Sequence, residues 1–345
     1  MSPRPIAVGL AVLVALSCAG PSAQPAATSA TPHATASATS SATPTAQPAA
    51  GSIPDAIAQI DPARLEAHMK ALAAFGSRAA GTTGHERARQ YILDQLKGLP
   101  GLQTGLFTTK EPGVLTSVIV TVNPLEPPPP PFVGGFLIAH YDSSASDTPG
   151  WKAASDPAPG ADEDATGVAA LLEYARILSA DRGLVKLPIV LAFFDGRYNA
   201  LGGSSRYAQQ SKTNQTVKWV IELDSIGFNP LKDRLDLVSY DQHSKKLGDR
   251  IRQANDKYAI GLGPVVEQMA TTENAIFDAA SFGLYVVPAA LLTERYGPPD
   301  ETYPGNPARR TVNDTPEKVT NKSLWLKVSK LALATALELA GGSPL

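Results

Sequence analysis

A histidine and several acidic residues stand at the ends of apolar segments, where chemistry would be expected. Residues 140–142 (HYD), 195–198 (DGRY) and 224–225 (DS) each end such a segment, and the acidic loop 162–164 (DED) precedes a helical pattern. Zinc prefers histidine nitrogen and carboxylate oxygen as ligands, and a catalytic zinc leaves one position for water. These residues could bind a metal, or they could be ordinary polar residues in the loops above a sheet. The spacing alone favours neither reading.

Two places carry the most informative residue types. Asp142 lies two residues after His140, which is the spacing of a metal ligand and a carboxylate that orients it. The turn FFDGRYNALGGS after Asp195 instead carries Arg197 and Tyr198. Neither of these two residues is an obvious catalyst at such a turn, so its purpose needs another explanation.

The elements that would position these residues follow from the apolar pattern. Apolar runs predict strands at 114–124, 134–142, 187–195, 216–228, 233–241 and 284–294. Periodic spacing predicts helices at 60–75, 85–99, 165–181, 204–210 and 243–256, and a long C-terminal helix that begins at Asp314. His68 and His85 fall in the first two helices and are expected to be surface or capping residues.

The alternation of strands and helices predicts one α/β domain over residues 54–345. Its central sheet should be mostly parallel and flanked by helices on both faces. Ligands bind such sheets at the carboxyl ends of the strands, which is where the polar residues above are expected to lie.

The same segment resembles peptidase family 28, the secreted co-catalytic zinc aminopeptidases whose fold is shared by glutaminyl cyclases. Six stretches occur in the family's order: FGSRAAGTTGHERARQYI, AHYDS, PGADEDATGVAALLE, FFDGRYNALGGSSRY, ELDSIGF and TVNDTPEKV. The resemblance implies the zinc-aminopeptidase fold, and by analogy a peptidase activity.

Part of the family's metal-binding set is kept at the matching positions. His140 and Asp224 match two zinc ligands, and Glu163 stands where the family has a bridging aspartate. The resemblance further implies that the carboxylates surrounding these ligands are Asp142, Asp162 and Asp164.

Another part of the set is replaced. The family's paired glutamates, a general base and a zinc ligand, become Arg197 and Tyr198, and its last histidine ligand becomes Arg310. Arginine cannot accept the proton of metal-bound water because its guanidinium stays protonated. Losing a general base alone costs about 10²–10⁴-fold in rate. We therefore expect zero or one zinc ion, and not two.

Arg197 and Arg310 could also supply the positive charge that the absent zinc ion would have provided. We expect Arg310, and less directly Arg197, to stand in for zinc. The guanidinium of Arg310 would then lie within about 4 Å of Glu163 or a neighbouring carboxylate.

Three hypotheses remain open. In the first, the protein is catalytically inactive or impaired, and the family's substrate site binds a peptide, a protein N-terminus or another partner. In the second, it is an active metallo-aminopeptidase or other hydrolase with a single zinc at His140, Glu163 and Asp224. In the third, it is a structural component of an envelope complex. Nucleic acid is not an expected partner, because 30 Lys and Arg residues are balanced by 32 Asp and Glu residues without a basic stripe.

The N-terminus predicts export and anchoring. Residues 1–18 read as a signal peptide whose end, Ala15 to Cys18, resembles the site at which bacterial lipoproteins are cleaved and lipidated on cysteine. Residues 19–53 consist almost wholly of Ala, Thr, Ser, Pro and Gln and predict a disordered tether. We expect a membrane-anchored lipoprotein that faces the periplasm or the cell exterior; the alternative is a secreted protein.

Overall fold

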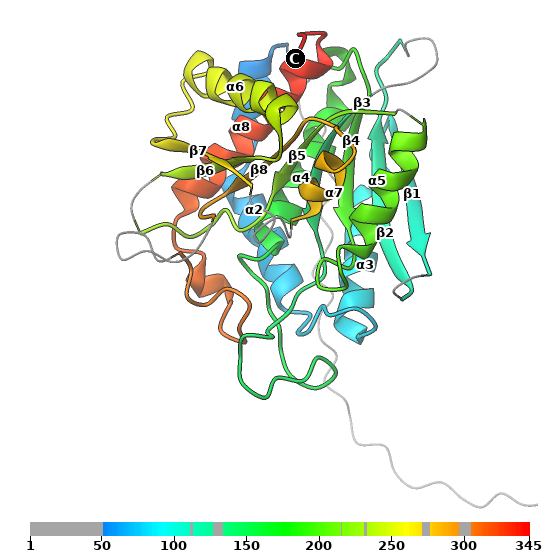
Figure 1. The fold of residues 1–345 in the computed structure, drawn as a ribbon, viewed down its shortest axis with the longest axis vertical. Coiled ribbons are helices and arrows are strands. Elements are labelled where there is room, and N and C mark those ends of the chain that lie inside the picture. Colours follow the sequence, from blue (N-terminus) through cyan, green and yellow to red (C-terminus); the bar gives the residue numbers. More distant parts are fainter. Residues whose placement is uncertain are drawn as a thin grey trace, which may run out of the picture. The chain divides into compact units, whose positions relative to one another are not determined.

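An eight-stranded sheet forms the core, with strand order β1-β2-β4-β3-β5-β8-β6-β7 (Figure 1). The computed structural model describes residues 51–110, 113–126, 134–214, 216–230, 233–270, 277–296 and 305–345. The strands are β1 (Leu102–Thr109), β2 (Leu115–Val122), β3 (Gly134–His140), β4 (Ile189–Phe194), β5 (Val217–Leu223), β6 (Leu235–Ser239), β7 (Val265–Met269) and β8 (Ala289–Thr293). The predicted signal peptide and almost all of the predicted tether lie outside the described residues.

The middle of the sheet is parallel. Strands β4, β3, β5 and β8 all run in one direction. β2 pairs antiparallel with β4, β1 with β2 and β6 with β8, while β7 runs parallel to β6. Because β3 and β4 are in register from Gly135 to His140, their carboxyl ends lie side by side. This arrangement brings the predicted polar residues to one edge.

Helices cover both faces of the sheet (Figure 1). One face carries α1 (Ile53–Ala58), α2 (Pro62–Ala73), α3 (Thr83–Leu96), α4 (Ala165–Ala180), α6 (Gln242–Lys257) and α8 (Lys322–Ala340). The other carries α5 (Gly202–Asn214) and α7 (Asp278–Gly283). Successive side chains of β3 alternate between the two cores: Leu137 packs with the first and Ile138 with the second. The predicted α/β fold with a mostly parallel sheet is therefore confirmed.

The acidic loop leads directly into α4. Asp164 is the N-cap of this helix, and its Oδ1 accepts a hydrogen bond from the amide of Gly167 at 3.0 Å. Almost the whole of α4 is buried, which suits its apolar sequence. The cap sets the residue at which α4 begins, and it therefore also sets the position of Glu163, which directly precedes the cap.

The C-terminal helix begins later than the sequence pattern predicts. A short 3₁₀ turn, η2 (Pro316–Lys318), precedes α8, whose N-cap is Asn321; a second such turn is η1 (Arg182–Leu184). Asp314 does not cap the helix. Its carboxylate accepts hydrogen bonds from the amides of Asp162 and Glu163, at 3.0 and 3.1 Å, and is thus used to hold the acidic loop.

The expectation for the two histidines is wrong, because both are buried. His68 Nδ1 bonds the hydroxyl of Tyr91 at 2.7 Å. His85 Nε2 bonds Asp195 Oδ1 at 2.8 Å, and its ring stacks on Tyr141. Each histidine therefore ties a helix to the structure beside it. No helix within the described ranges is both long enough and apolar enough to cross a bilayer.

Candidate functional site

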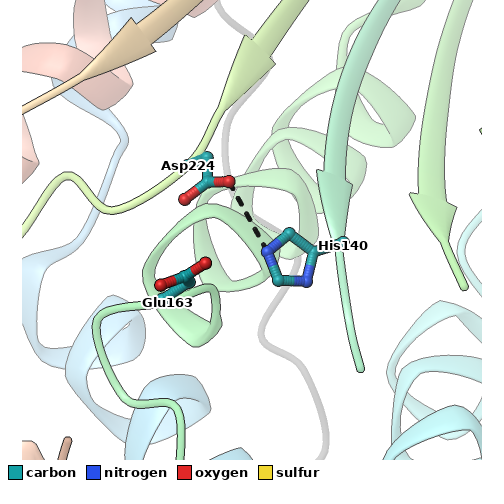
Figure 2. A group of neighbouring side chains, drawn as sticks. All are labelled: His140, Glu163 and Asp224. Atoms are coloured by element: carbon teal, nitrogen blue, oxygen red, sulfur yellow. Dashed lines mark ion pairs between the residues drawn. The ribbon is translucent and has the colours of Figure 1, made fainter. Parts of the chain in front are cut away.

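Three side chains from distant parts of the sequence meet at the carboxyl edge of the sheet. Figure 2 shows His140 at the end of β3, Glu163 in the loop before α4 and Asp224 just after β5. One nitrogen or oxygen atom of each lies within 4.8 Å of the others, and all three residues are buried. The sequence predicts these three residues as ligands of one metal site, and in the structure they lie close together.

His140 and Asp224 face each other across this group. His140 Nδ1 donates to the carbonyl oxygen of Asp142 at 2.9 Å, which leaves Nε2 toward Asp224 Oδ2 at 3.6 Å. Neither Nε2 nor Oδ2 has a hydrogen-bond partner. Burial alone would lower the pKa of His140, but the carboxylates of Asp142 and Asp224 outweigh it and raise that pKa well above 6.5. Two buried polar atoms that make no hydrogen bond within the described residues thus face each other as an ion pair.

Glu163 is fully engaged. The guanidinium of Arg309 donates through Nε to Oε2 and through Nη2 to Oε1, the latter at 3.2 Å. The hydroxyl of Tyr198 donates to Oε1 at 2.6 Å. Burial, and then the charge of Glu163, raise the pKa of Tyr198 well above 10, so that its hydroxyl keeps its proton. Both oxygens of Glu163 therefore already have donors.

Arg197 lies on the other side of Asp224. Its Nε is 3.5 Å from Asp224 Oδ2, and its guanidinium stacks over the ring of Phe277 at 4.6 Å. Asp142 anchors the turn that carries Arg197. The backbone amides of Arg197 and Tyr198 donate to the two carboxylate oxygens of Asp142 at 3.2 and 3.3 Å. Burial would raise the pKa of Asp224, but His140 and then the two arginines, Arg197 and Arg309, lower it.

The expectation for Arg310 is wrong. Its Nη2 bonds Ser146 Oγ at 3.0 Å and pairs with Asp147 Oδ1 at 3.3 Å, away from Glu163. The preceding residue, Arg309, makes the expected contact, and its Nη2 also lies 4.0 Å from Asp224 Oδ1. Arg310 has a left-handed φ of 58°, a local reversal that motif matching does not reveal. The expectation for Arg197 agrees with the geometry.

The carboxylates around the three candidate ligands accept hydrogen bonds that fix the nearby backbone. Asp164 Oδ2 accepts from the amide of His140 at 3.2 Å, in addition to capping α4. Asp162 accepts from the amide of Gly227 at 2.8 Å and from the side-chain amide of Asn306 at 2.7 Å. These bonds join the acidic loop to β3, to the segment after β5 and to the C-terminal segment.

One buried residue of the site was not singled out from the sequence. Arg78 is fully buried and donates to the carbonyl oxygens of Tyr141 at 2.8 Å, Gly160 at 3.0 Å and Pro159. It thereby joins the loop after β3 to the loop before α4. The residue lies inside the matched stretch FGSRAAG, but nothing in that stretch distinguished it from a surface arginine.

Comparison with known proteins decides the family. Residues 118–335 match the family described as Peptidase family M28. The chain belongs to this family. Among curated proteins it is 29% identical over 203 residues to a probable zinc metalloprotease of Pyricularia oryzae, a match that covers 52% of this chain and 39% of that protein. A second probable zinc metalloprotease, from Pyrenophora tritici-repentis, is 27% identical over 191 residues, covering 50% and 38%. The M28 chain thus spans about two-fifths of the length of these relatives.

Solved structures share its fold. The LapA aminopeptidase of Legionella pneumophila aligns with a TM-score of 0.68 at 19% identity, covering 84% of this chain and 74% of that one. The glutaminyl cyclase of Bacteroides thetaiotaomicron, bound to N-acetylhistamine, aligns with a TM-score of 0.63 at 17% identity, covering 81% and 98%. At this identity the likeness concerns the fold alone.

The family's zinc can be tested against the residues present. The unpartnered Nε2 of His140 and Oδ2 of Asp224 suit a zinc ion, and with Glu163 they form a candidate metal site. Glu163, however, is bound on both oxygens, and Arg197 and Arg309 lie within 4.0 Å of Asp224. An ion entering here would meet two fixed positive charges. With the arginines in place, the residues do not fit a zinc ion.

Proposed function

We propose that this chain is a non-catalytic member of family M28, exported and held at the cell envelope by a lipid on Cys18. In this proposal the family's substrate site binds a peptide, a protein N-terminus or another partner without cleaving it. The observation that carries the proposal is Arg197, which stands at the general-base position and lies 3.5 Å from Asp224.

The chemistry of peptide hydrolysis explains why this residue matters. A carboxylate at this position takes a proton from the attacking water and can return it to the leaving amine. A buried guanidinium beside a carboxylate stays charged, because the negative charge of Asp224 favours the protonated form. Burial lowers the pKa of Arg197, but the neighbouring acidic groups, Asp224 foremost, outweigh burial and raise that pKa above its ordinary value. The position can therefore donate hydrogen bonds but cannot accept a proton.

The test is a hydrolysis assay with a matched variant. Purified protein is incubated with aminoacyl nitroanilides and with peptides that begin with glutamine, with and without added zinc. We expect no turnover above that of His140→Ala, which removes a candidate ligand and would leave the signal of a contaminating peptidase unchanged.

A second candidate function follows from the unpartnered atoms of His140 and Asp224. These atoms would suit a single-zinc hydrolase that uses His140, Glu163 and Asp224 as ligands. Zinc-dependent turnover in the native chain that His140→Ala abolishes would favour this candidate and would refute the non-catalytic proposal.

A further inference from the structure

We infer that Arg309 is the internal occupant of a latent metal site, and that removing its guanidinium opens a site for one zinc-type divalent cation at His140, Glu163 and Asp224. The inference deepens the proposed function because it explains how the fold dispenses with the family's metal. It concerns binding and stability, so it can fail independently of any statement about catalysis.

Arg309 contacts the same carboxylate oxygens that would bind a metal cation at this site. Its planar fork bonds both oxygens of Glu163 through two nitrogens, the geometry in which arginine binds a carboxylate most strongly. Its Nη2 also lies 4.0 Å from Asp224 Oδ1. One guanidinium therefore lies beside two of the three candidate ligands.

The burial of the group places Arg309 on its solvent side. The side chain of Arg309 is 27% exposed, whereas those of Glu163 and Asp224 are 1% and 0% exposed. Of these three side chains, only that of Arg309 reaches solvent. A cation arriving from solution would have to displace it.

Without Arg309, Glu163 would lose its only cationic partner among the described residues. Asp224 would keep Arg197 and His140 beside it. Glu163 would be left with the hydroxyl of Tyr198. His140 Nε2 and Asp224 Oδ2, which make no hydrogen bond within the described part of the chain, would still converge, with Arg197 remaining 3.5 Å from that oxygen. A buried carboxylate that loses its cation destabilises the fold, takes up a proton or binds another cation. One histidine and two carboxylates are a ligand set that zinc accepts, with a fourth position left open.

The neighbouring residue supplies a matched control. Arg310 is adjacent in sequence and comparably exposed, at 35%, but it pairs with Asp147, which is itself 52% exposed. An exposed pair of this kind contributes little to stability. Arg310 also bonds Ser146, and its guanidinium lies over the ring of Tyr198 at 5.9 Å, but it contacts neither of the two candidate carboxylate ligands directly. Replacing Arg310 should therefore leave metal binding unchanged and lower the melting temperature only slightly.

The experiment compares four proteins: the native chain, Arg309→Met, Arg310→Met and the double variant Arg309→Met/His140→Ala. Each is treated with a chelator, dialysed against Zn²⁺ or Co²⁺ and measured by elemental analysis, by the visible spectrum of bound Co²⁺ and by thermal unfolding. We expect the native chain and Arg310→Met to retain no stoichiometric metal and to melt at temperatures unaffected by either ion. Arg309→Met should bind one ion per chain and melt higher when it is bound. The double variant should bind none.

Two results would overturn the inference. One is a native chain that holds a zinc ion while Arg309 is present. The other is a folded Arg309→Met that binds neither ion. If Arg309→Met does not fold without metal, refolding in Zn²⁺ should rescue it, and failure of that rescue would count equally against the latent site. Hydrolysis by the metal-free native chain would instead contradict the proposed function and leave the assignment of Arg309 standing.

Discussion

At the scale of single residues, the site is defined by the side chains that pair with its two buried carboxylates. Glu163 accepts from Tyr198 and Arg309, and Asp224 lies beside His140 and Arg197. Each negative charge is thus matched by a donor of this chain. Motif matching located five of these six residues, but it chose Arg310 instead of the preceding Arg309. Which of the two arginines faces Glu163 depends on the left-handed backbone conformation at Arg310, and this conformation cannot be predicted from the residue types.

The hydroxyl of Tyr198 should contribute measurably to stability. Tyr198→Phe removes its 2.6 Å bond to Glu163, and hydrogen bonds to charged groups contribute about 1.5–3 kcal/mol. We expect the free energy of unfolding, measured in urea, to fall by that amount. Tyr91→Phe is the comparison, because it removes a bond to the uncharged His68 and should cost only about 1 kcal/mol. Equal losses in the two variants would count against a charged Glu163 at the site.

At the scale of elements, strong local patterns were predictable and weak ones were not. Strands β3 and β4 and helix α4 follow from long apolar runs and periodic spacing, and they carry or adjoin the site. Strand β1 was missed because it lies at the sheet edge with five of its eight residues exposed, and so lacks an apolar run. The start of α8 was misplaced because Asp314 holds the acidic loop, a tertiary contact about 150 residues away in sequence.

The contact between α2 and α3 should make stability depend on pH. Burial lowers the pKa of His68 from 6.5 to about 4. Between these values the unfolded chain binds a proton that the folded chain does not, so stability falls as the pH drops through this range. From pH 7 to pH 4.5 the native chain should lose about 2–3 kcal/mol more unfolding free energy than His68→Gln. Urea titrations at both pH values measure this difference, and parallel losses in the two proteins would show that His68 contributes nothing to it.

At the scale of the whole molecule, the proposal joins a folded domain to an anchor. The sequence before residue 51 predicts a signal peptide, a lipidated cysteine and a tether, and this part lies outside the described structure. A single acyl chain holds a protein to a membrane only weakly, so lasting attachment implies more than one. The proposed arrangement would keep the M28 domain near the membrane without inserting it.

Lipidation of Cys18 can be tested by fractionation. In a bacterial host the native chain should sediment with membranes, and its mature N-terminal peptide should carry a lipid mass. Cys18→Ser should block maturation or release the protein, whereas Ser17→Ala should leave it in the membrane fraction. A native chain found wholly in the soluble fraction without lipid would refute the anchor.

The central claim is that cationic side chains of the chain itself take the place of the family's metal. The most direct measurement is anomalous diffraction at the zinc absorption edge from crystals of the native protein soaked in Zn²⁺. We predict no peak between His140, Glu163 and Asp224, with the guanidinium of Arg309 on Glu163. A strong peak bonded to His140 and Asp224, with Arg309 turned away, would contradict the claim.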